Sequence, residues 1–238
     1  MTLDTTDALA SQLEVFRHAA NWKRTLARHI TPHLGAKVLE VGAGIGGTTL
    51  WLCGYGVREW RCLEPDPALH SMLRANQEAG LLPACCFAEL GDIQSIPSER
   101  TFDAILYVDV LEHIQDDAAQ LRHAASRLNP GGRLIVMSPA HQFLFSEFDR
   151  AIGHVRRYDL DAFRAVLPEE LTTIKLHYLD SVGFLASLAN RLLLRQAMPG
   201  LQQILLWDRV MVRLSGLLDP LLGYRAGKSL FYVGKRTP

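Results

Sequence analysis

The pattern of hydrophobic and polar residues divides the chain near residue 140. Before this point, short apolar runs such as 37–42 and 133–140 alternate with stretches whose apolar residues recur at helical spacing, such as 66–80. Strands that alternate with helices in this way predict right-handed crossovers and a parallel sheet that is covered by helices on both faces. A helix is also expected over residues 6–30, because apolar positions recur at helical spacing there and Pro32 follows.

The pattern after residue 140 is different. A long aromatic and charged connection at 141–158 comes first, followed by a helix at 159–167 and a strand at 171–179. A helical stretch at 181–218, broken at Pro199-Gly200, then leads to a final strand at 228–236. We expect the two strands to form an antiparallel hairpin at the sheet edge, with the last strand as the edge strand. The helices between them would then cap the carboxyl ends of the parallel strands.

The stretch VLEVGAGIGGTTL, residues 38–50, reads as a strand, a glycine turn and the start of a helix, which is the opening of a nucleotide-binding unit. Its glycines satisfy the dinucleotide fingerprint G-x-G-x-x-G. Glu40 argues against a dinucleotide, because a carboxylate just before the turn would repel a pyrophosphate. The same carboxylate suits a ligand that is cationic at this point, such as the ammonium group of an amino acid.

S-adenosylmethionine is such a ligand, since it has an adenosine, an ammonium, a sulfonium and no phosphate. Glu64, at the end of RCLEPD, can accept hydrogen bonds from both ribose hydroxyls. Asp92, in GDIQSIP, follows the third strand and can accept from the adenine amine, while the backbone N–H of Ile93 can donate to the ring. These residues favour S-adenosylmethionine as the cofactor.

Five motifs occur in order along residues 36–140: VLEVGAGIGGTT, CLEPDP, GDIQSIP, FDAILYVDVLEHIQDD and LNPGGRLIVMSPA. In this series the sequence resembles the class I S-adenosylmethionine-dependent methyltransferases. The resemblance implies a Rossmann-like α/β fold, with a mostly parallel seven-stranded sheet and helices on both faces. It also implies a cofactor site formed by Glu40, Gly42, Gly44, Gly46, Glu64, Pro65, Asp92, Ile93 and Asp109. Asp116 and Asp117, which follow Asp109 in the same motif, offer an equally good N-cap to the next helix.

We expect a single domain over residues 1–238. Its predicted parts are an N-terminal helical lid, the cofactor-binding half, a substrate loop with the sheet edge, a helical cap and the final strand, at residues 1–35, 36–140, 141–180, 181–223 and 224–238.

Methyl transfer requires alignment of the acceptor and, for some acceptors, removal of a proton. His113, His141 and His154 follow predicted strands and are the candidate general bases, although His113 could instead close a loop over the cofactor. Arg156, Arg157 and Tyr158 are the candidate substrate-binding residues, because adjacent arginines can clamp a carboxylate or phosphate. The alternative is that these arginines pair with nearby acids of the same loop and order it.

The segment 181–223 is rich in leucine but is interrupted by charges, so no membrane span is expected. Three interpretations remain open: a cap over the acceptor pocket, a homodimer interface, or a peripheral helix that contacts lipid or a lipid-like substrate.

Composition narrows the choice of partners and location. The formal net charge is zero, which argues against broad attraction to nucleic acid. Four cysteines lack the spacing of a metal site, so no metal is expected. The N-terminus carries acids and no apolar core, so we expect no signal peptide and predict a cytoplasmic protein with reduced thiols.

The sequence therefore predicts an S-adenosylmethionine-dependent methyltransferase that acts at oxygen or nitrogen of a small acceptor, which is partly hydrophobic and lipid-like or anionic. The rival interpretations are an RNA methyltransferase, a non-enzymatic cofactor-binding or scaffold protein of the same fold, and an NAD(P)-dependent enzyme, which Glu40 disfavours.

Overall fold

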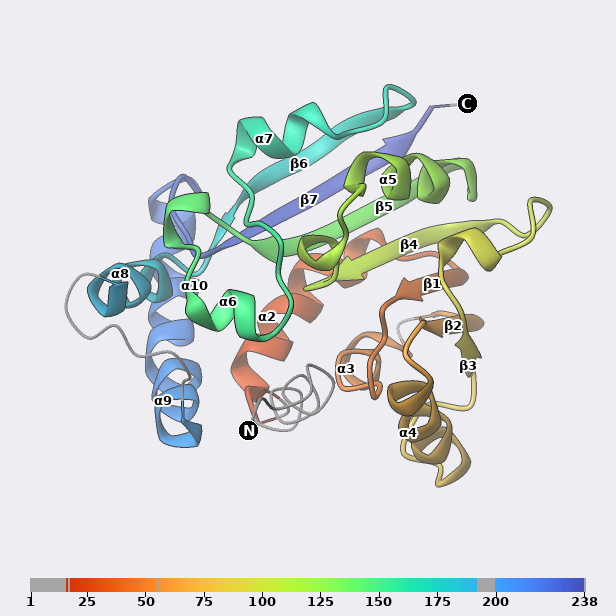
Figure 1. The fold of residues 1–238 in the computed structure, drawn as a ribbon, viewed down its shortest axis with the longest axis horizontal. Helices are drawn as coiled ribbons and strands as arrows, with labels where there is room; N and C mark the ends of the chain where they lie inside the picture. The colour runs from red at the N-terminus through yellow and green to blue at the C-terminus, as the bar shows by residue number, and fades with distance from the viewer. Residues whose placement is uncertain (1–15, 17, 55, 192–199, 238) are drawn as a thin grey trace.

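The computed structural model describes residues 16, 18–54, 56–191 and 200–237. Seven strands form one sheet in the order β3-β2-β1-β4-β5-β7-β6 (Figure 1). Strands β1 to β5 pair in parallel, and β7 is antiparallel to both of its neighbours. In chain order the strands are Lys37–Val41, Glu59–Glu64, Cys86–Leu90, Phe102–Val108, Leu128–Pro139, Leu171–Leu179 and Ser229–Arg236. The predicted Rossmann-like seven-stranded sheet is confirmed.

The antiparallel pair lies at one side of the sheet, as expected, but the order within the pair differs from the prediction. The final strand β7 lies between β5 and β6, so β6 is the edge strand. Residues Ser229–Gly234 are buried on both faces, whereas residues 172–174 of β6 are exposed. The run of apolar residues in β7 is typical of a central strand, and this explains the correction.

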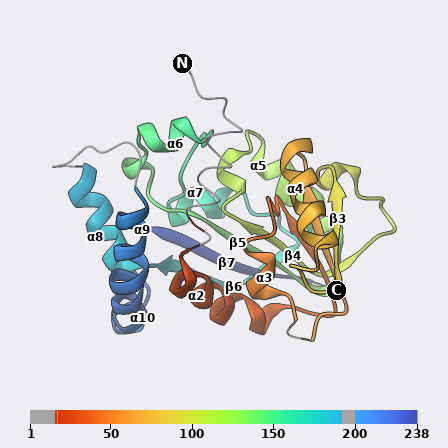
Figure 2. The same cartoon turned by 90° about the horizontal axis from the view of Figure 1, so that it is seen from below.

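Helices cover both faces of the sheet, as predicted. One apolar cluster joins the sheet to α2, α3, α4 and the helices after residue 200, and the other joins it to α5 and α7. The helices α2 to α10 are Ala20–Ile30, Thr49–Leu52, Pro67–Glu78, Asp117–Ser126, Glu147–Ala151, Leu160–Ala165, Ser181–Ala189, Leu201–Leu206 and Val212–Leu221. A π-helical turn, Trp207–Met211, joins α9 to α10. Figure 2 shows α8, α9 and α10 together at one end of the sheet, beside α2.

Two boundaries differ from the sequence prediction. Strand β5 begins before the apolar run at 133–140, since helix α5 ends at Ser126 and β5 already begins at Leu128. The N-terminal helix is present from Ala20 to Ile30, and its predicted beginning at residues 6–15 lies outside the described residues. No helix of the described chain is long and apolar enough to cross a membrane.

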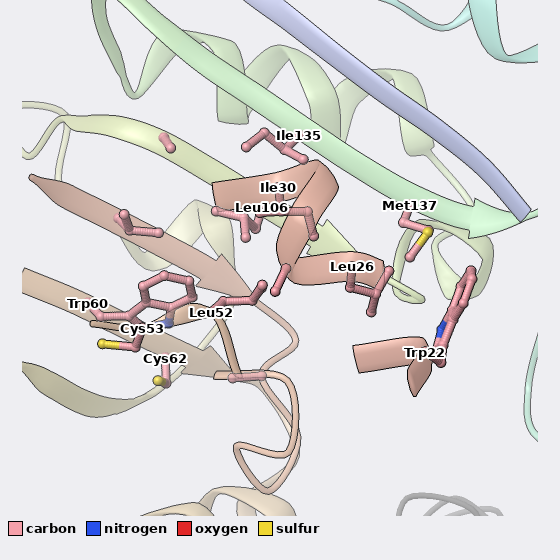
Figure 3. Close-up of a cluster of buried hydrophobic side chains, with 14 of the residues drawn as sticks. Trp22, Leu26, Ile30, Leu52, Cys53, Trp60, Cys62, Leu106, Ile135 and Met137 are labelled. Carbon is pink, nitrogen blue, oxygen red and sulfur yellow. The ribbon is translucent and has the colours of Figure 1, made fainter. Parts of the chain in front are cut away.

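The four cysteines gather in one apolar cluster behind the glycine turn, where Figure 3 shows Cys53 and Cys62 beside Trp60. The Sγ atom of Cys53 lies 3.1 Å from that of Cys85 and 3.3 Å from that of Cys86. The hydrogen bond with Cys86, together with burial, raises the pKa of Cys53, and burial raises the pKa of Cys85. Folding therefore brings together thiols whose spacing in the sequence indicated no shared site.

Candidate functional site

The glycine turn between β1 and α3 has backbone angles that favour glycine. Gly42 has φ of +69°, and its N–H donates to the carbonyl of Leu63 over 2.7 Å. A Cβ atom on Gly42 would lie 2.6 Å from a methyl group of Val110, so a side chain is excluded. Gly44 and Gly46 also have positive φ, at +57° and +86°. The turn therefore keeps its backbone accessible at the carboxyl end of β1.

Glu64 ends β2 beside this turn, at a buried position. One carboxylate oxygen accepts from the N–H of Gly44 over 2.8 Å, and the other accepts from the N–H of Asp66 over 3.0 Å. Burial raises the pKa of Glu64, although these hydrogen bonds oppose the rise. Pro65 follows it at an exposed position. Each oxygen keeps a second lone pair that can accept from a ligand.

Asp92 and Ile93 form the start of a short 3₁₀ turn after β3. The Asp92 carboxylate caps this turn by accepting from the N–H groups of Gln94 and Ser95, each over 3.0 Å. The Asp92 side chain is exposed, whereas Ile93 is fully buried in the core. The acid is therefore held in a fixed position and can be reached from solvent.

Glu40 is buried and bonds to side chains of the neighbouring elements. One of its oxygens accepts from the hydroxyl of Thr49 over 2.5 Å and from the indole N–H of Trp60 over 2.9 Å. Burial raises the pKa of Glu40. These contacts give Glu40 a role in positioning α3 against β1 and β2.

Charged side chains from α2, from the end of β4 and from the start of β7 interact electrostatically around Asp109. Asp109 follows β4 with φ of +55°, and solvent reaches its side chain. Burial among surrounding protein atoms nevertheless raises the pKa of Asp109, and the positive charge of Lys23 opposes this rise. The ammonium of Lys228 lies 3.8 Å from Asp180 and 3.9 Å from the Trp207 ring centre.

His154 is paired with a buried carboxylate. Its Nδ1 lies 2.8 Å from an oxygen of Asp149, which is itself buried and also accepts from Arg157 and Ser146. Burial disfavours a charged Asp149, but the hydrogen bonds from His154 and Arg157 outweigh it and hold the pKa of Asp149 well below its usual range. An ionised carboxylate can only accept, so Nδ1 donates and Nε2 is left as the basic nitrogen.

Glu112 and His113 lie opposite this basic nitrogen. One Glu112 oxygen accepts from Ser138, and the other lies 3.7 Å from Nε2 of His154, with no hydrogen-bond partner among the described residues. Burial, together with the charge of Asp109, raises the pKa of Glu112. Burial, together with the charge of His154, lowers the pKa of His113 to about 4, so His113 is neutral at pH 7. The ligand-type atoms of Glu112, His113 and His154 lie within 4.8 Å of one another.

His141 lies apart from this group, at the end of β5. Its Nε2 lies 2.9 Å from the carbonyl oxygen of Gly227, its Nδ1 lies 3.3 Å from Asp159, and its ring packs against Tyr178. Both ring nitrogens therefore contact the protein itself. These contacts join the substrate loop to the start of β7.

The three predicted substrate residues all bond to acids or carbonyls of the protein. Arg156 donates to Asp117 over 2.7 Å and to a backbone carbonyl, and Arg157 donates to both oxygens of Asp149 over 2.9 Å. The buried Tyr158 hydroxyl donates to Asp117 over 2.6 Å. This arrangement supports the alternative that the arginines order the loop.

Four further charged residues near the candidate site were not predicted from the sequence: Lys23, Glu112, Asp180 and Lys228. Asp149 was expected only as a loop acid that could pair with an arginine. One signal was present, because Ser146 stands three residues before Asp149 in the spacing of a capping box. The others depend on contacts between distant parts of the chain, which no local pattern indicates.

Comparison with known proteins agrees with this geometry. The sequence profile of a methyltransferase domain matches residues 9–178. An uncharacterized methyltransferase of Mycobacterium tuberculosis is 31% identical over 160 residues, which cover 66% of this chain and 62% of that protein. A tRNA U34 carboxymethyltransferase of Aeromonas salmonicida is 32% identical over 123 residues, which cover 48% of this chain and 35% of that protein. The chain thus matches less than two thirds of the length of these relatives.

Solved structures share the fold. The N-methyltransferase NodS from Bradyrhizobium japonicum, in complex with S-adenosylhomocysteine, aligns with a TM-score of 0.58 at 15% identity, covering 93% of this chain and 89% of that one. S-adenosylhomocysteine is what remains of the cofactor after methyl transfer. The glycine turn, the sheet order and the family profile together identify the chain as a member of the class I methyltransferases, an enzyme that uses S-adenosylmethionine.

Proposed function

We propose that the protein transfers a methyl group from S-adenosylmethionine to an oxygen or nitrogen of a small, partly hydrophobic acceptor, with His154 as the general base. The observation that carries this proposal is the buried Asp149–His154 pair, which leaves Nε2 as the basic nitrogen, 3.7 Å from Glu112. The pair combines a fixed tautomer with a carboxylate that stabilises the protonated ring.

The residues around the glycine turn fit S-adenosylmethionine. Glu64 and Asp92 are held acceptors suited to the ribose hydroxyls and the adenine amine, and Asp109 and Lys23 supply opposite charges suited to an amino acid end. Glu40 would act indirectly, by positioning α3. S-adenosylmethionine supplies an electrophilic methyl group when bound. The protein's contribution is to align the acceptor and to receive its proton on Nε2 of His154.

The other predicted catalytic and substrate residues have positioning roles in this proposal. His141 joins the ends of β5 and β7, His113 packs edge to face on His154 with ring centres 4.6 Å apart, and Arg157 holds Asp149. Arg156 and Tyr158 hold the loop through Asp117.

The test compares His154→Ala with His141→Ala. Each variant receives radiolabelled S-adenosylmethionine and a panel of alkylphenols and alkylamines, and the labelled product is extracted and counted. We expect His154→Ala to lower turnover by about 10²- to 10⁴-fold with unchanged affinity for S-adenosylhomocysteine. His141→Ala should mainly lower stability. Equal turnover in His154→Ala and wild type, for an acceptor that the wild type methylates, would remove His154 as the base.

Chelation separates this proposal from a metal-assisted reaction. Glu112, His113 and His154 are close enough together to bind a divalent ion. With His154 as a base, the rate should be the same with and without EDTA, and added Zn²⁺ should inhibit because it competes with the proton for Nε2. Activity that EDTA abolishes and Zn²⁺ restores would instead assign a metal to these three residues.

An RNA methyltransferase is the second candidate, and the tRNA-modifying relative favours it. Exposed Arg24, Arg28 and Arg213 lie on one side of the molecule and could contact phosphates. Incorporation of label into unmodified tRNA, with no transfer to any small acceptor, would select this candidate. Cofactor binding with no transfer to either class would support the non-enzymatic interpretation.

A further inference from the structure

The helices after residue 200 have an unusual distribution of polar residues. The side that faces the protein includes Asp208, Ser215 and Asp219, which are 2%, 2% and 4% exposed. Asp208 accepts from the backbone N–H groups of Asn21 and Trp22 in α2, and Asp219 accepts from those of residues 180 and 181. These buried hydrogen bonds fix which side of the helices faces inward.

The outward side is apolar. Leu206, Val210, Leu214, Leu217 and Leu221 are spaced three or four residues apart, and Leu217 and Leu221 are 69% and 81% exposed. We call these five residues the leucine stripe. Half of the exposed large hydrophobic side chains in the described part of the chain lie between residues 201 and 222. A stripe of this length on a helix surface indicates a partner.

Arginines flank the leucine stripe, and α2 and residues 200–225 of the described chain carry no exposed acid. Arg209 and Arg213 are exposed on the same helical segment, and Arg24 and Arg28 are exposed on α2. A groove of about 720 Å³ between α2 and α10 is lined by Arg24, Arg28 and Arg213. The two acids within residues 200–225 are Asp208 and Asp219, which face inward, and α2 contains none. This face is therefore cationic although the whole chain is neutral.

We propose that the leucine stripe and its flanking arginines form a binding site for an anionic phospholipid membrane. The leucines would enter the boundary between headgroups and acyl chains, and the arginines would contact lipid phosphates. A second copy of the chain fits less well, because a two-fold contact through this face would bring arginines against arginines.

Trp207 connects the stripe with the charged residues of the candidate site. It lies on the same helical segment and packs against Trp22 and Lys228, while α2 carries both Lys23 and the exposed Arg24. Figure 2 shows this segment beside α2 at one end of the sheet. If the proposed function holds, the acceptor reaches His154 from the bilayer; the membrane site itself does not depend on the reaction.

The test is flotation of the full chain with vesicles of phosphatidylglycerol and phosphatidylcholine. We expect binding to vesicles that contain phosphatidylglycerol and weak binding to pure phosphatidylcholine. The double variant Leu217→Glu/Leu221→Glu should lose binding by at least about tenfold, whereas Leu81→Glu, a control at a 60% exposed leucine, should bind like wild type. Arg209→Gln/Arg213→Gln should weaken binding roughly 5-fold for each charge removed and reduce its dependence on salt.

Two measurements separate a loss of binding from a loss of folding. The circular dichroism spectrum and the affinity for S-adenosylhomocysteine should be the same in the glutamate variant and in wild type. Flotation that is equal in Leu217→Glu/Leu221→Glu and wild type would overturn the proposal. The proposal would also be overturned if wild type formed a dimer in light scattering and the glutamate variant were a monomer. It would equally be overturned if wild type bound tRNA but did not float with vesicles, and the arginine variant lost the tRNA binding.

Discussion

The predicted cofactor-binding residues and the helices after residue 200 differ in the sequence distance that their polar contacts bridge. Among the former, Asp92 caps its own turn and Glu64 bonds to residues two and twenty positions away. Among the latter, Asp208 bonds to Asn21 across 187 positions, and Asp219 bonds to the backbone of Asp180 across 39. A local contact leaves a readable motif, whereas a long-range contact becomes visible only in the folded chain.

The largest expected effect is on stability, through Asp208. Asp208→Ala removes an acceptor that binds two backbone N–H groups of α2, so buried donors are left unpaired. We expect the free energy of unfolding to fall by about 3–5 kcal/mol, as measured by urea denaturation. Asp208→Asn keeps one acceptor oxygen and should lose less. Equal stability of wild type and Asp208→Ala would show that long-range contacts do not hold the helices after residue 200 against α2.

The next effect is on cofactor affinity. Glu64→Ala should weaken binding of S-adenosylhomocysteine by about 1.5–3 kcal/mol, because hydrogen bonds to a charged group are lost. Isothermal titration calorimetry measures this change, and Glu64→Gln is the conservative control. Unchanged affinity, or tight binding of NAD in place of S-adenosylhomocysteine, would contradict the assigned role of Glu64.

A smaller effect is expected on the pH dependence of stability, through His29 in α2. Burial is the main cause that lowers the pKa of His29 to about 4, with the charge of His177 in β6 second. The unfolded chain takes up this proton at about pH 6.5 and the folded chain does not, so stability is lost as the pH falls from about 6.5 to 4.

The variant His29→Gln isolates this contribution. Between pH 7 and pH 4.5, wild type should lose about 1–2 kcal/mol more stability than His29→Gln, since partial exposure reduces the full effect. Parallel stability curves for the two proteins would show that His29 titrates normally in the folded state.

The smallest effect is expected at Asp92, which caps its 3₁₀ turn and is also the proposed acceptor for the adenine amine. One substitution can separate these two roles. Asp92→Ser keeps a good cap for the turn but has a shorter side chain as acceptor. The free energy of unfolding should therefore change by less than about 0.5 kcal/mol. Affinity for S-adenosylhomocysteine should fall by about 1 kcal/mol. A loss of stability with unchanged affinity would make Asp92 a structural cap alone.

The sequence predicted the sheet and the glycine turn well, because apolar runs and glycine spacing are local signals. The predicted order of β6 and β7 was wrong, although the residues did contain a signal. The run LFYV in β7 is hydrophobic, whereas LTTIK in β6 carries polar residues typical of an edge. The bonds from Arg157 to Asp149 agree with the alternative that the arginines pair with acids of the loop. The contact of His154 with Asp149 was not predicted, since it is set by how the loop closes. Asp208 could not be predicted, because its partners lie in α2.

The buried thiols make the wild-type chain a convenient host for site-specific labels. The thiolate is the form that reacts with maleimides, and the raised pKa values of Cys53 and Cys85 keep it scarce at pH 7. Cys53, Cys62 and Cys86 are also at most 7% exposed. A cysteine introduced by Leu221→Cys, at an 81% exposed position, should therefore react first. A fluorophore there, quenched by brominated lipids, would report how deeply this helix enters a bilayer without any native cysteine being removed.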